Sequence, residues 1–455
     1  MRILCRHNLI LLLTLILAFI ALLYRADKPF WGHHDFNNAF FGNIARNTLR
    51  YGVVVTRFGQ VVNSGIVTPS EFSYHTHHPG LLITLLTLSY YFFGITEIST
   101  RLVPIILSVL TVLLLYVIVK KLYSPAVAAL AAVFWIITPL YLYFGKMAVH
   151  EIPVLFFFLF SLWRYLAWNE GNSRRNFVWL IIGIILGCLS GWPGYYTPVS
   201  LLVYHFLLHR KFEKKLVWLI IVPLGLFLAH VSQTFILSGS FTGGGFNSAF
   251  ALRSSRPDFL AFLKLETTYI LLYFTKPLVL ISLAGLLLFF AKRTYQFPLM
   301  LLLFGSLHPL LFEEAANRHD YLIYYLLPFI SVTAGFFISR MLLKSRPAGA
   351  FFAVAVIALS VIQSSKYTAT LLNGDRFKDG VVIGRYIKEN SAISDRVLLL
   401  LKKPNMEFEG WHTTFYSDRN ISVIKGGVIS SDEKLSAYDE IVTYLPNGSL
   451  TLIRN

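Results

Sequence analysis

Cysteine is nearly absent from this chain of 455 residues, in which only Cys5 and Cys188 occur. One lies at the extreme N-terminus and the other inside an apolar run, so a disulfide framework is excluded. Acids are also scarce, since 23 aspartates and glutamates stand against 40 lysines and arginines. In a soluble protein this basic excess would suggest nucleic acid. Here the basic residues form short clusters between apolar runs, which is typical of cytoplasmic membrane loops and predicts no nucleic-acid partner.

Apolar residues, by contrast, make up 56% of the chain, and the mean hydropathy is +0.62. Both values lie far above those of an ordinary soluble domain. Roughly 20 apolar residues are needed to cross the hydrocarbon core, and this length test predicts a polytopic α-helical membrane protein of about 11 spans. The candidate spans are 9–24, 101–119, 124–144, 152–168, 177–190, 197–209, 216–237, 268–291, 296–312, 321–340 and 349–363.

The first of these runs follows Arg2, Arg6 and His7, a pattern shared with secretory signal peptides. No small-residue cleavage site follows the run, and further spans come after it. We therefore predict an uncleaved membrane anchor.

Another apolar run, 79–94, is shorter than a span and is bounded by Pro79 and Gly94. If the N-terminus is cytoplasmic and this run does not cross, every basic cluster falls in the cytoplasm; counting it as a span would place all of them outside. We predict that it dips into the outer leaflet and returns, which leaves the C-terminus outside a plasma or inner membrane. The clusters are Lys120-Lys121, Arg174-Arg175, Arg210-Lys211 with Lys214-Lys215, Lys292-Arg293, and Arg340 with Lys344 and Arg346.

The chain changes character near residue 366, where charged residues become frequent and short β-rich runs alternate with turn residues. We predict a transmembrane domain over 1–365 and a small extracytoplasmic α/β domain over 366–455. The elements expected in the second domain are a helix at 380–389, with Ile383, Tyr386 and Ile387 on one face, and strands at 397–401, 421–424 and 440–444.

The long first outward loop contains an acid at a predicted helix start. From Phe36 the apolar residues Phe36, Phe40 and Ile44 recur at helical spacing, so Asp35 is a candidate N-cap of an interfacial helix. The carboxylate could act in chemistry at this position, or it could simply cap the helix.

A second acid, Glu151, stands between two apolar runs, next to His150 and before Pro153, with Lys146 shortly upstream. An ionisable side chain at such a boundary is a functional candidate. The alternative is an acid that stabilises a helix start through the macrodipole.

Histidines gather in the same outward segments, at His33, His34, His75, His77 and His78. With the two acids they could hold a divalent metal, for which we take Asp35, Glu151 and His78 as the candidate ligands. Their spacing matches no zinc signature, and imidazoles in this position could instead bind phosphate.

At the outer end of a later span the sequence reads Arg318-His319-Asp320-Tyr321. The planar guanidinium of Arg318 suits a pair of phosphate oxygens, and His319 adds a donor, so this group could grip a lipid phosphate. The alternative is a charged turn that pins the helix end.

Taken in order, these residues resemble the C-class glycosyltransferases, and among them the protein O-mannosyltransferase and aminoarabinose-transferase branch. The resemblance covers about residues 9–170, and residues 318–328 match more weakly. The resemblance rests on Asp35, His78-Pro79, Phe93-Gly94 followed by Arg101-Leu102-Val103-Pro104, and Glu151. This chain departs from the common pattern in having Asp35-Phe36 for Asp-Glu and His78-Pro79-Gly80 for His-Pro-Pro.

The resemblance implies transfer of a sugar from a polyprenyl-phosphate carrier to a hydroxyl of a protein, glycan or lipid acceptor outside the cytoplasm, by single displacement with inversion. It places the general base or acceptor-orienting group on Asp35, and the second catalytic acid, often an aspartate in relatives, on Glu151. No cofactor is required, although a divalent cation is compatible with the residues. The expected donor-phosphate residues are Arg318, His319, His77 and His78, and the expected pocket residues are His34, His150, Tyr321 and Lys146.

Two other classes of protein fit many of the same features. A lipid or solute transporter also has many spans with few charges inside the membrane, but the sequence shows no inverted repeat and its polar candidates gather at one face. A non-catalytic assembly subunit with an outward binding domain is the third interpretation.

Overall fold

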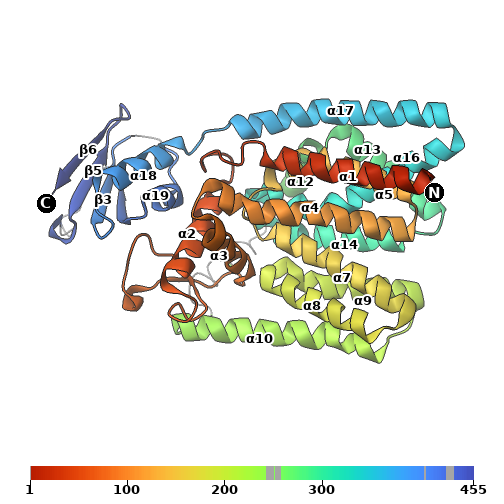
Figure 1. Cartoon of the computed structure of the whole chain (residues 1–455), viewed down its shortest axis with the longest axis horizontal. Helices are drawn as coiled ribbons and strands as arrows, with labels where there is room; N and C mark the ends of the chain where they lie inside the picture. The colour runs from red at the N-terminus through yellow and green to blue at the C-terminus, as the bar shows by residue number, and fades with distance from the viewer. Residues whose placement is uncertain (1, 242–250, 252–257, 404–405, 427–434, 455) are drawn as a thin grey trace. The chain divides into compact units, whose positions relative to one another are not determined.

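The computed structural model describes residues 2–241, 251, 258–403, 406–426 and 435–454 (Figure 1). The chain divides into two compact units. The first comprises Met1–Arg25, His77–Leu82 and Pro104–Thr370, and the second comprises Ala26–Thr76, Ile83–Val103 and Leu371–Asn455.

The first unit is helical. Its α-helices are α1 (Arg2–Leu23), α5 (Pro125–Ile136), α6 (Pro139–Phe144), α7 (Glu151–Gly171), α8 (Arg174–Ser190), α9 (Tyr196–His209), α10 (Trp218–Ser238), α12 (Phe259–Tyr273), α13 (Lys276–Ala291), α14 (Gln296–Leu311), α15 (Glu313–Arg318) and α16 (Leu327–Lys344), with most of α4 (Glu97–Leu122) and α17 (Arg346–Asn373). Short 3₁₀ helices are η2 (Trp192–Tyr195), η3 (Lys214–Val217) and η4 (Asp320–Leu326).

Close packing between α13 and α16 shows how these helices associate. A Cβ atom added at Gly285 would lie 2.0 Å from the carbonyl oxygen of Thr333, so only glycine allows this approach. The hydroxyls of Ser282 and Thr333 are 2.7 Å apart and form a hydrogen bond, while the rings of Phe289 and Phe336 stack at 3.9 Å. Small residues and interhelical hydroxyl bonds are the usual means of helix association in membranes.

Among the described residues, five helical stretches are long and apolar enough to cross a membrane, or up to six if one bent pair counts as a single span. The predicted multi-span helical architecture is therefore confirmed, whereas the count of about 11 spans stays a prediction. The five stretches are Glu97–Leu122, Glu151–Gly171, Lys214–Ser238, Asp320–Lys344 and Arg346–Asn390.

Two predicted spans are not single straight helices. The run 124–144 breaks between α5 and α6, where the Thr138 hydroxyl accepts the Tyr141 N–H and so starts a new helix before Pro139. The run 268–291 bends by 106° between α12 and α13, where Thr275 has a φ of +69°. Hydropathy alone cannot reveal such breaks, because both sides of each break are apolar.

The ambiguous run 79–94 forms α3 (Leu81–Phe93), a helix of 13 residues. At 1.5 Å per residue it is about 20 Å long, too short for a hydrocarbon core of about 30 Å. Its length favours the predicted re-entrant position over a full span.

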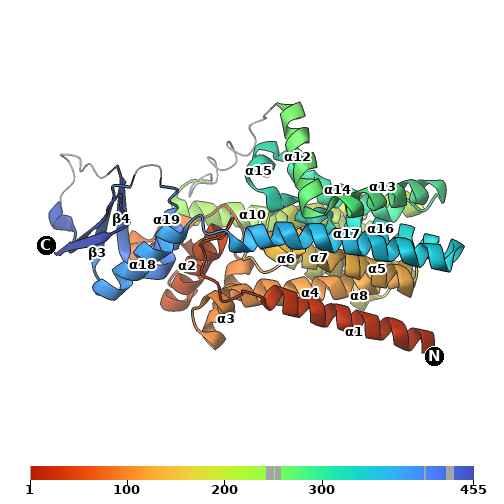
Figure 2. The same ribbon diagram turned by 90° about the horizontal axis from the view of Figure 1, so that it is seen from above.

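The second unit joins the first-loop helix α2 (Phe36–Tyr51) to the C-terminal residues. A short hairpin pairs β1 (Gln60–Val61) with β2 (Tyr74–His75). The main sheet has the order β4-β3-β5-β6, with β6 antiparallel to its neighbour, and α18 and α19 lie next to each other beside it (Figure 2). The bounds are α18 (Lys378–Asn390), α19 (Gly410–Ser417), β3 (Arg396–Leu401), β4 (Asn420–Lys425), β5 (Glu440–Tyr444) and β6 (Leu450–Arg454).

The predicted helix and strands of the C-terminal region are confirmed. Ile383 and Ile387 of α18 are fully buried against Val397, Leu399 and Val442 of the sheet, as the periodicity indicated. The predicted domain boundary after residue 365 falls inside α17, and residues 371–455 group with the first loop. The division into a transmembrane domain and an extracytoplasmic domain at that boundary stays a prediction.

Candidate functional site

Asp35 lies at the position before the first residue of α2, as predicted, but its side chain makes no capping hydrogen bond. Instead Oδ2 accepts the backbone N–H of Gly32 at 2.9 Å, and Oδ1 accepts the side-chain amide of Asn38 at 2.8 Å. Asp35 is only 6% exposed. The capping alternative is therefore wrong, and the carboxylate is held in one orientation by donors outside the helix backbone.

Arg101 is a neighbour of Asp35 that no local sequence pattern predicts. Its Nη2 lies 3.3 Å from Oδ1 of Asp35, and its Nη1 donates to the carbonyls of Ala26 and Lys28 at 2.8 and 2.5 Å. The guanidinium also lies over the ring of Phe30, 4.8 Å from its centroid. The Arg101-Leu102-Val103-Pro104 motif contributed to the resemblance, but nothing local in it indicates an ion pair with a residue 66 positions earlier.

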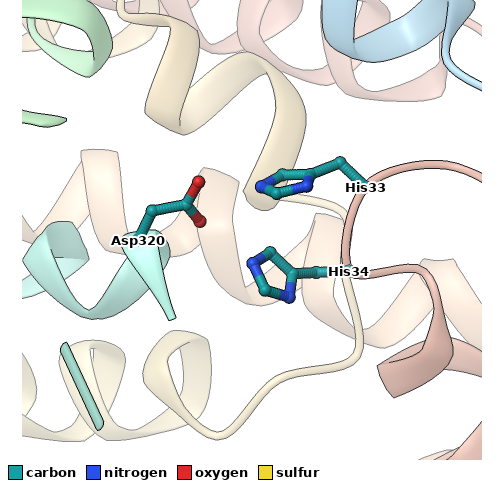
Figure 3. Close-up of side chains that lie close together, drawn as sticks. All are labelled: His33, His34 and Asp320. Carbon is teal, nitrogen blue, oxygen red and sulfur yellow. The ribbon is translucent and has the colours of Figure 1, made fainter. Parts of the chain in front are cut away.

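The histidines before Asp35 form a ring pair in the second unit. The centroids of His33 and His34 are 4.1 Å apart, and Figure 3 shows both rings extending from the loop that leads into α2. His34 has a φ of +57°, a left-handed conformation that is uncommon for a non-glycine residue. A backbone held in this way is frequent at functional sites.

Glu151 begins α7, and His150 precedes it, both of them buried. The ring of His150 stacks on that of His78 with centroids 4.2 Å apart, and its Nδ1 lies 2.6 Å from the carbonyl oxygen of Ser190. The first unit therefore brings His78 of the predicted phosphate group beside His150 of the predicted pocket, next to the second acid.

The neighbouring candidates His77 and Lys146 are also buried in the first unit. Trp192 donates its indole N–H to the carbonyl of His77 at 2.6 Å, which ties this segment to η2. The ammonium of Lys146 donates to the carbonyl of Tyr24 at the end of α1. The first contact holds the backbone at His77, and the second holds the side chain of Lys146.

Arg318 is the last residue of α15, and its Nε donates to Glu314 at 2.7 Å. Asp320, drawn in Figure 3 at the start of η4, accepts the hydroxyl of Tyr273 at 2.6 Å. The rings of His319 and Tyr321, the residues directly before and after Asp320 in the chain, have centroids 5.4 Å apart. The four predicted residues of this motif thus lie where α15 ends and η4 begins.

The predicted site residues are divided between the two units. Asp35 and His34 belong to the second unit, whereas Glu151 belongs to the first with the remaining candidates. A shared pocket for the two acids stays a prediction.

A divalent cation fits Asp35 poorly. The guanidinium of Arg101 already lies beside Oδ1, and N–H donors already bond to both carboxylate oxygens. A second cation there would be repelled by the first. Asp35 is therefore a poor ligand for a metal ion.

The buried histidine His412 of α19 makes the stability of the second unit depend on pH. Burial lowers the pKa of His412 below its usual value, opposed in part by a hydrogen bond to the Glu409 carbonyl and by the charge of Asp35. Because the folded state disfavours the proton, stability is complete above the unfolded pKa of about 6.5 and is lost as pH falls below it, by at most about 1.4 kcal/mol per pH unit. Limited proteolysis of the C-terminal region should therefore be faster at about pH 5.5 than at about pH 7.5. A His412→Phe protein that kept the full pH response would contradict this assignment.

Comparison with known proteins gives a family match over part of the chain. Residues 77–235 match the model of the family described as dolichyl-phosphate-mannose-protein mannosyltransferase. An uncharacterized protein of Aquifex aeolicus (strain VF5) is 27% identical over 210 residues, which make up 45% of this chain and 38% of that protein. This chain thus spans well under half of that relative.

Solved structures share the fold over nearly the whole chain. ArnT from Cupriavidus metallidurans, bound to undecaprenyl phosphate, has a TM-score of 0.66 at 13% identity and covers 94% of this chain and 87% of its own. The oligosaccharyltransferase AglB from Archaeoglobus fulgidus, in complex with an inhibitory peptide and a dolichol-phosphate, has a TM-score of 0.64 at 13% identity, covering 99% and 74%.

The matched family is an enzyme family, so neither the transporter nor the assembly-subunit interpretation gains support. The five described helical stretches long and apolar enough to cross a membrane agree with a multi-pass membrane protein. The resemblance first seen in Asp35, His78-Pro79, Arg101 and Glu151 is confirmed at two levels: residues 77–235 match the dolichyl-phosphate-mannose-protein mannosyltransferase family, and nearly the whole chain shares its fold with ArnT.

Proposed function

We propose that this protein transfers a sugar from a polyprenyl-phosphate carrier to an acceptor hydroxyl by a single displacement with inversion. The observation that carries the proposal is the buried carboxylate of Asp35, held by Gly32, Asn38 and Arg101. An oriented carboxylate is what a general base needs, because the proton must be taken within hydrogen-bond reach as the new bond forms.

In this mechanism the acceptor oxygen attacks the anomeric carbon while its proton passes to Asp35. The bond from that carbon to the phosphate oxygen breaks, and the phosphate leaves with the electron pair. Because attack and departure occur on opposite faces, the configuration at the anomeric carbon is inverted. Glu151 acts as the second acid of the site, oriented by its position at the start of α7.

The leaving phosphate needs cationic or donor neighbours, since negative charge develops on it. We assign this role to Arg318, His319, His77 and His78. The packing of His78 on His150 supports the assignment, because it fixes an imidazole beside the second acid. His34, His150, Tyr321 and Lys146 complete the proposed donor and acceptor pocket.

The distribution of basic clusters supports a cytoplasmic N-terminus, with the C-terminal residues and the reaction on the opposite side of a plasma or inner membrane. The acceptor is then a protein, glycan or lipid reached from outside. The sugar donor is already on that side, attached to its carrier lipid.

Arg318 provides a test of the phosphate assignment. Arg318→Gln should raise the KM for the lipid-linked donor roughly tenfold while changing kcat less than about twofold, because a charge-assisted bond made in the ground state is lost. Steady-state kinetics with varied donor concentration measure both constants.

Glu314→Gln is the matched control, because it breaks the same ion pair but leaves the guanidinium in place. If Arg318 only pins the end of α15, both variants should behave alike. Equal effects of the two substitutions would therefore contradict phosphate binding.

The function itself is tested with purified protein in detergent or liposomes. Dolichyl-phosphate mannose and an undecaprenyl-phosphate-linked aminoarabinose are the first donors to try, together with peptide, glycan and lipid acceptors. We expect one donor to be consumed with release of the free carrier phosphate. Absence of transfer across a wide panel of lipid-linked sugars, with a folded protein that binds carrier lipid, would contradict the proposal.

A further inference from the structure

The C-terminal helix α19 packs directly against the first-loop helix α2. Arg46 of α2, 5% exposed, donates to the carbonyls of Phe415 and Thr414 at 2.8 and 3.2 Å. Asp418, just past the end of α19, is paired with Arg46 at 3.2 Å and with Arg50 at 2.5 Å. Cations beside the last carbonyls of a helix stabilise it, so the two helices form one fixed assembly.

Tyr416 of α19 extends this assembly to the loop before Asp35. Its hydroxyl accepts the backbone N–H of Phe30 at 2.8 Å and donates to the Glu97 carboxylate at 2.8 Å. The ring of Phe30 is fully buried, with centroids 5.0 Å from Phe415 and 6.1 Å from Tyr416. The phenol therefore fixes both the backbone and the ring of Phe30.

Phe30 in turn supports Arg101, whose guanidinium lies over its ring and donates to the preceding carbonyls of Ala26 and Lys28. Arg101 is the cation paired with Asp35. A continuous series of contacts thus runs from Tyr416 through Phe30 and Arg101 to the carboxylate.

Three more hydrogen bonds connect the same loop to the start of the C-terminal region. Lys28 donates to the carbonyls of Leu372 and Gly374 at 2.6 and 2.9 Å, and the Phe377 N–H donates to the Trp31 carbonyl at 3.0 Å. The loop carrying Asp35 is therefore bonded to the C-terminal region on both sides of Phe30.

We propose that the C-terminal region contributes to catalysis. In it, Tyr416 is a positioning residue that holds Asp35 in place through Phe30 and Arg101. This inference rests on the proposed function of Asp35 as the base. It gives the C-terminal region a role in catalysis that is independent of which acceptor the enzyme uses.

The test is a double-mutant cycle in the full-length protein, assayed with the lipid-linked sugar that the function assay identifies. Tyr416→Phe keeps the ring but removes both hydrogen bonds, and we expect kcat to fall roughly tenfold with the donor KM changed less than about twofold. In an Asp35→Asn background the same substitution should have little further effect, because residues that act as one unit are not additive.

Tyr386→Phe is the control, since the Tyr386 hydroxyl makes no hydrogen bond within the described part of the chain and its loss should leave kcat unchanged. Hydrogen exchange should show faster exchange for residues 26–35 in Tyr416→Phe, with α18 still protected. If Tyr416→Phe does not fold, Phe30→Leu provides a second variant, because it removes the ring beneath Arg101 and should lower kcat to a similar extent.

Wild-type kcat in the folded Tyr416→Phe and Phe30→Leu proteins would overturn the inference. An equal loss with and without Asp35 would also overturn it, because Tyr416 would then act elsewhere. Full activity of Asp35→Asn alone is a separate result that would overturn the proposed role of Asp35 itself.

Discussion

Asp35→Asn should lower the rate of sugar transfer at least about 100-fold, because an amide cannot take the proton from the acceptor hydroxyl. Binding of the carrier lipid should remain within about twofold of the wild-type value, since the substitution removes a group that acts in the chemical step. Single-turnover transfer and a separate binding measurement with undecaprenyl phosphate distinguish the two effects.

The loop offers a matched control in Asp27→Asn, which makes the same chemical change at an exposed acid before Phe30. This variant should transfer sugar at nearly the wild-type rate. If both substitutions impaired transfer equally, the loss would reflect the charge of the loop, and Asp35 would have no special role.

Glu151→Gln should produce the second large effect, a loss of turnover of roughly 10- to 100-fold. The side chain is only 7% exposed and begins α7, so the amide replaces a buried carboxyl group at a fixed position. Its shape is nearly unchanged, and the helix should still form because Pro153 remains in the first turn. Initial rates at saturating donor and acceptor measure the change.

Glu170→Gln tests the same substitution at the other end of α7. Glu170 is 65% exposed and pairs with Lys121 at 2.7 Å, a surface contact that contributes at most about 1 kcal/mol to stability. We expect its turnover to stay within about twofold of the wild type. A wild-type rate in Glu151→Gln would remove the second acid from the mechanism.

Local sequence patterns predicted the elements of the fold well where periodicity was decisive. The face of α18 with Ile383 and Ile387 follows from helical spacing, and the buried strand at 397–401 follows from a short apolar run bounded by turn residues. The bend at Thr275 and the break before Pro139 did not, because they depend on packing against other helices and lie within continuous apolar runs.

In the candidate site, too, local sequence predicts some residues, whereas others depend on contacts between residues distant in the chain. Asp35 and Glu151 stand out because acids are few. Asp35 precedes apolar residues at helical spacing, and Glu151 stands between two apolar runs. Arg101 and Tyr416 could not be assigned in this way, since their roles come from contacts with residues distant in the chain, 319 positions apart for Tyr416 and Glu97. Only the folded second unit brings them to the Asp35 loop.

The configuration of the anomeric carbon in the product is the most direct test of the account. Direct attack by an acceptor hydroxyl activated by Asp35 predicts complete inversion relative to the lipid-linked donor, which NMR of the purified glycoside would show. Retention would require two successive displacements through a covalent sugar intermediate, and it would contradict the mechanism proposed for this site.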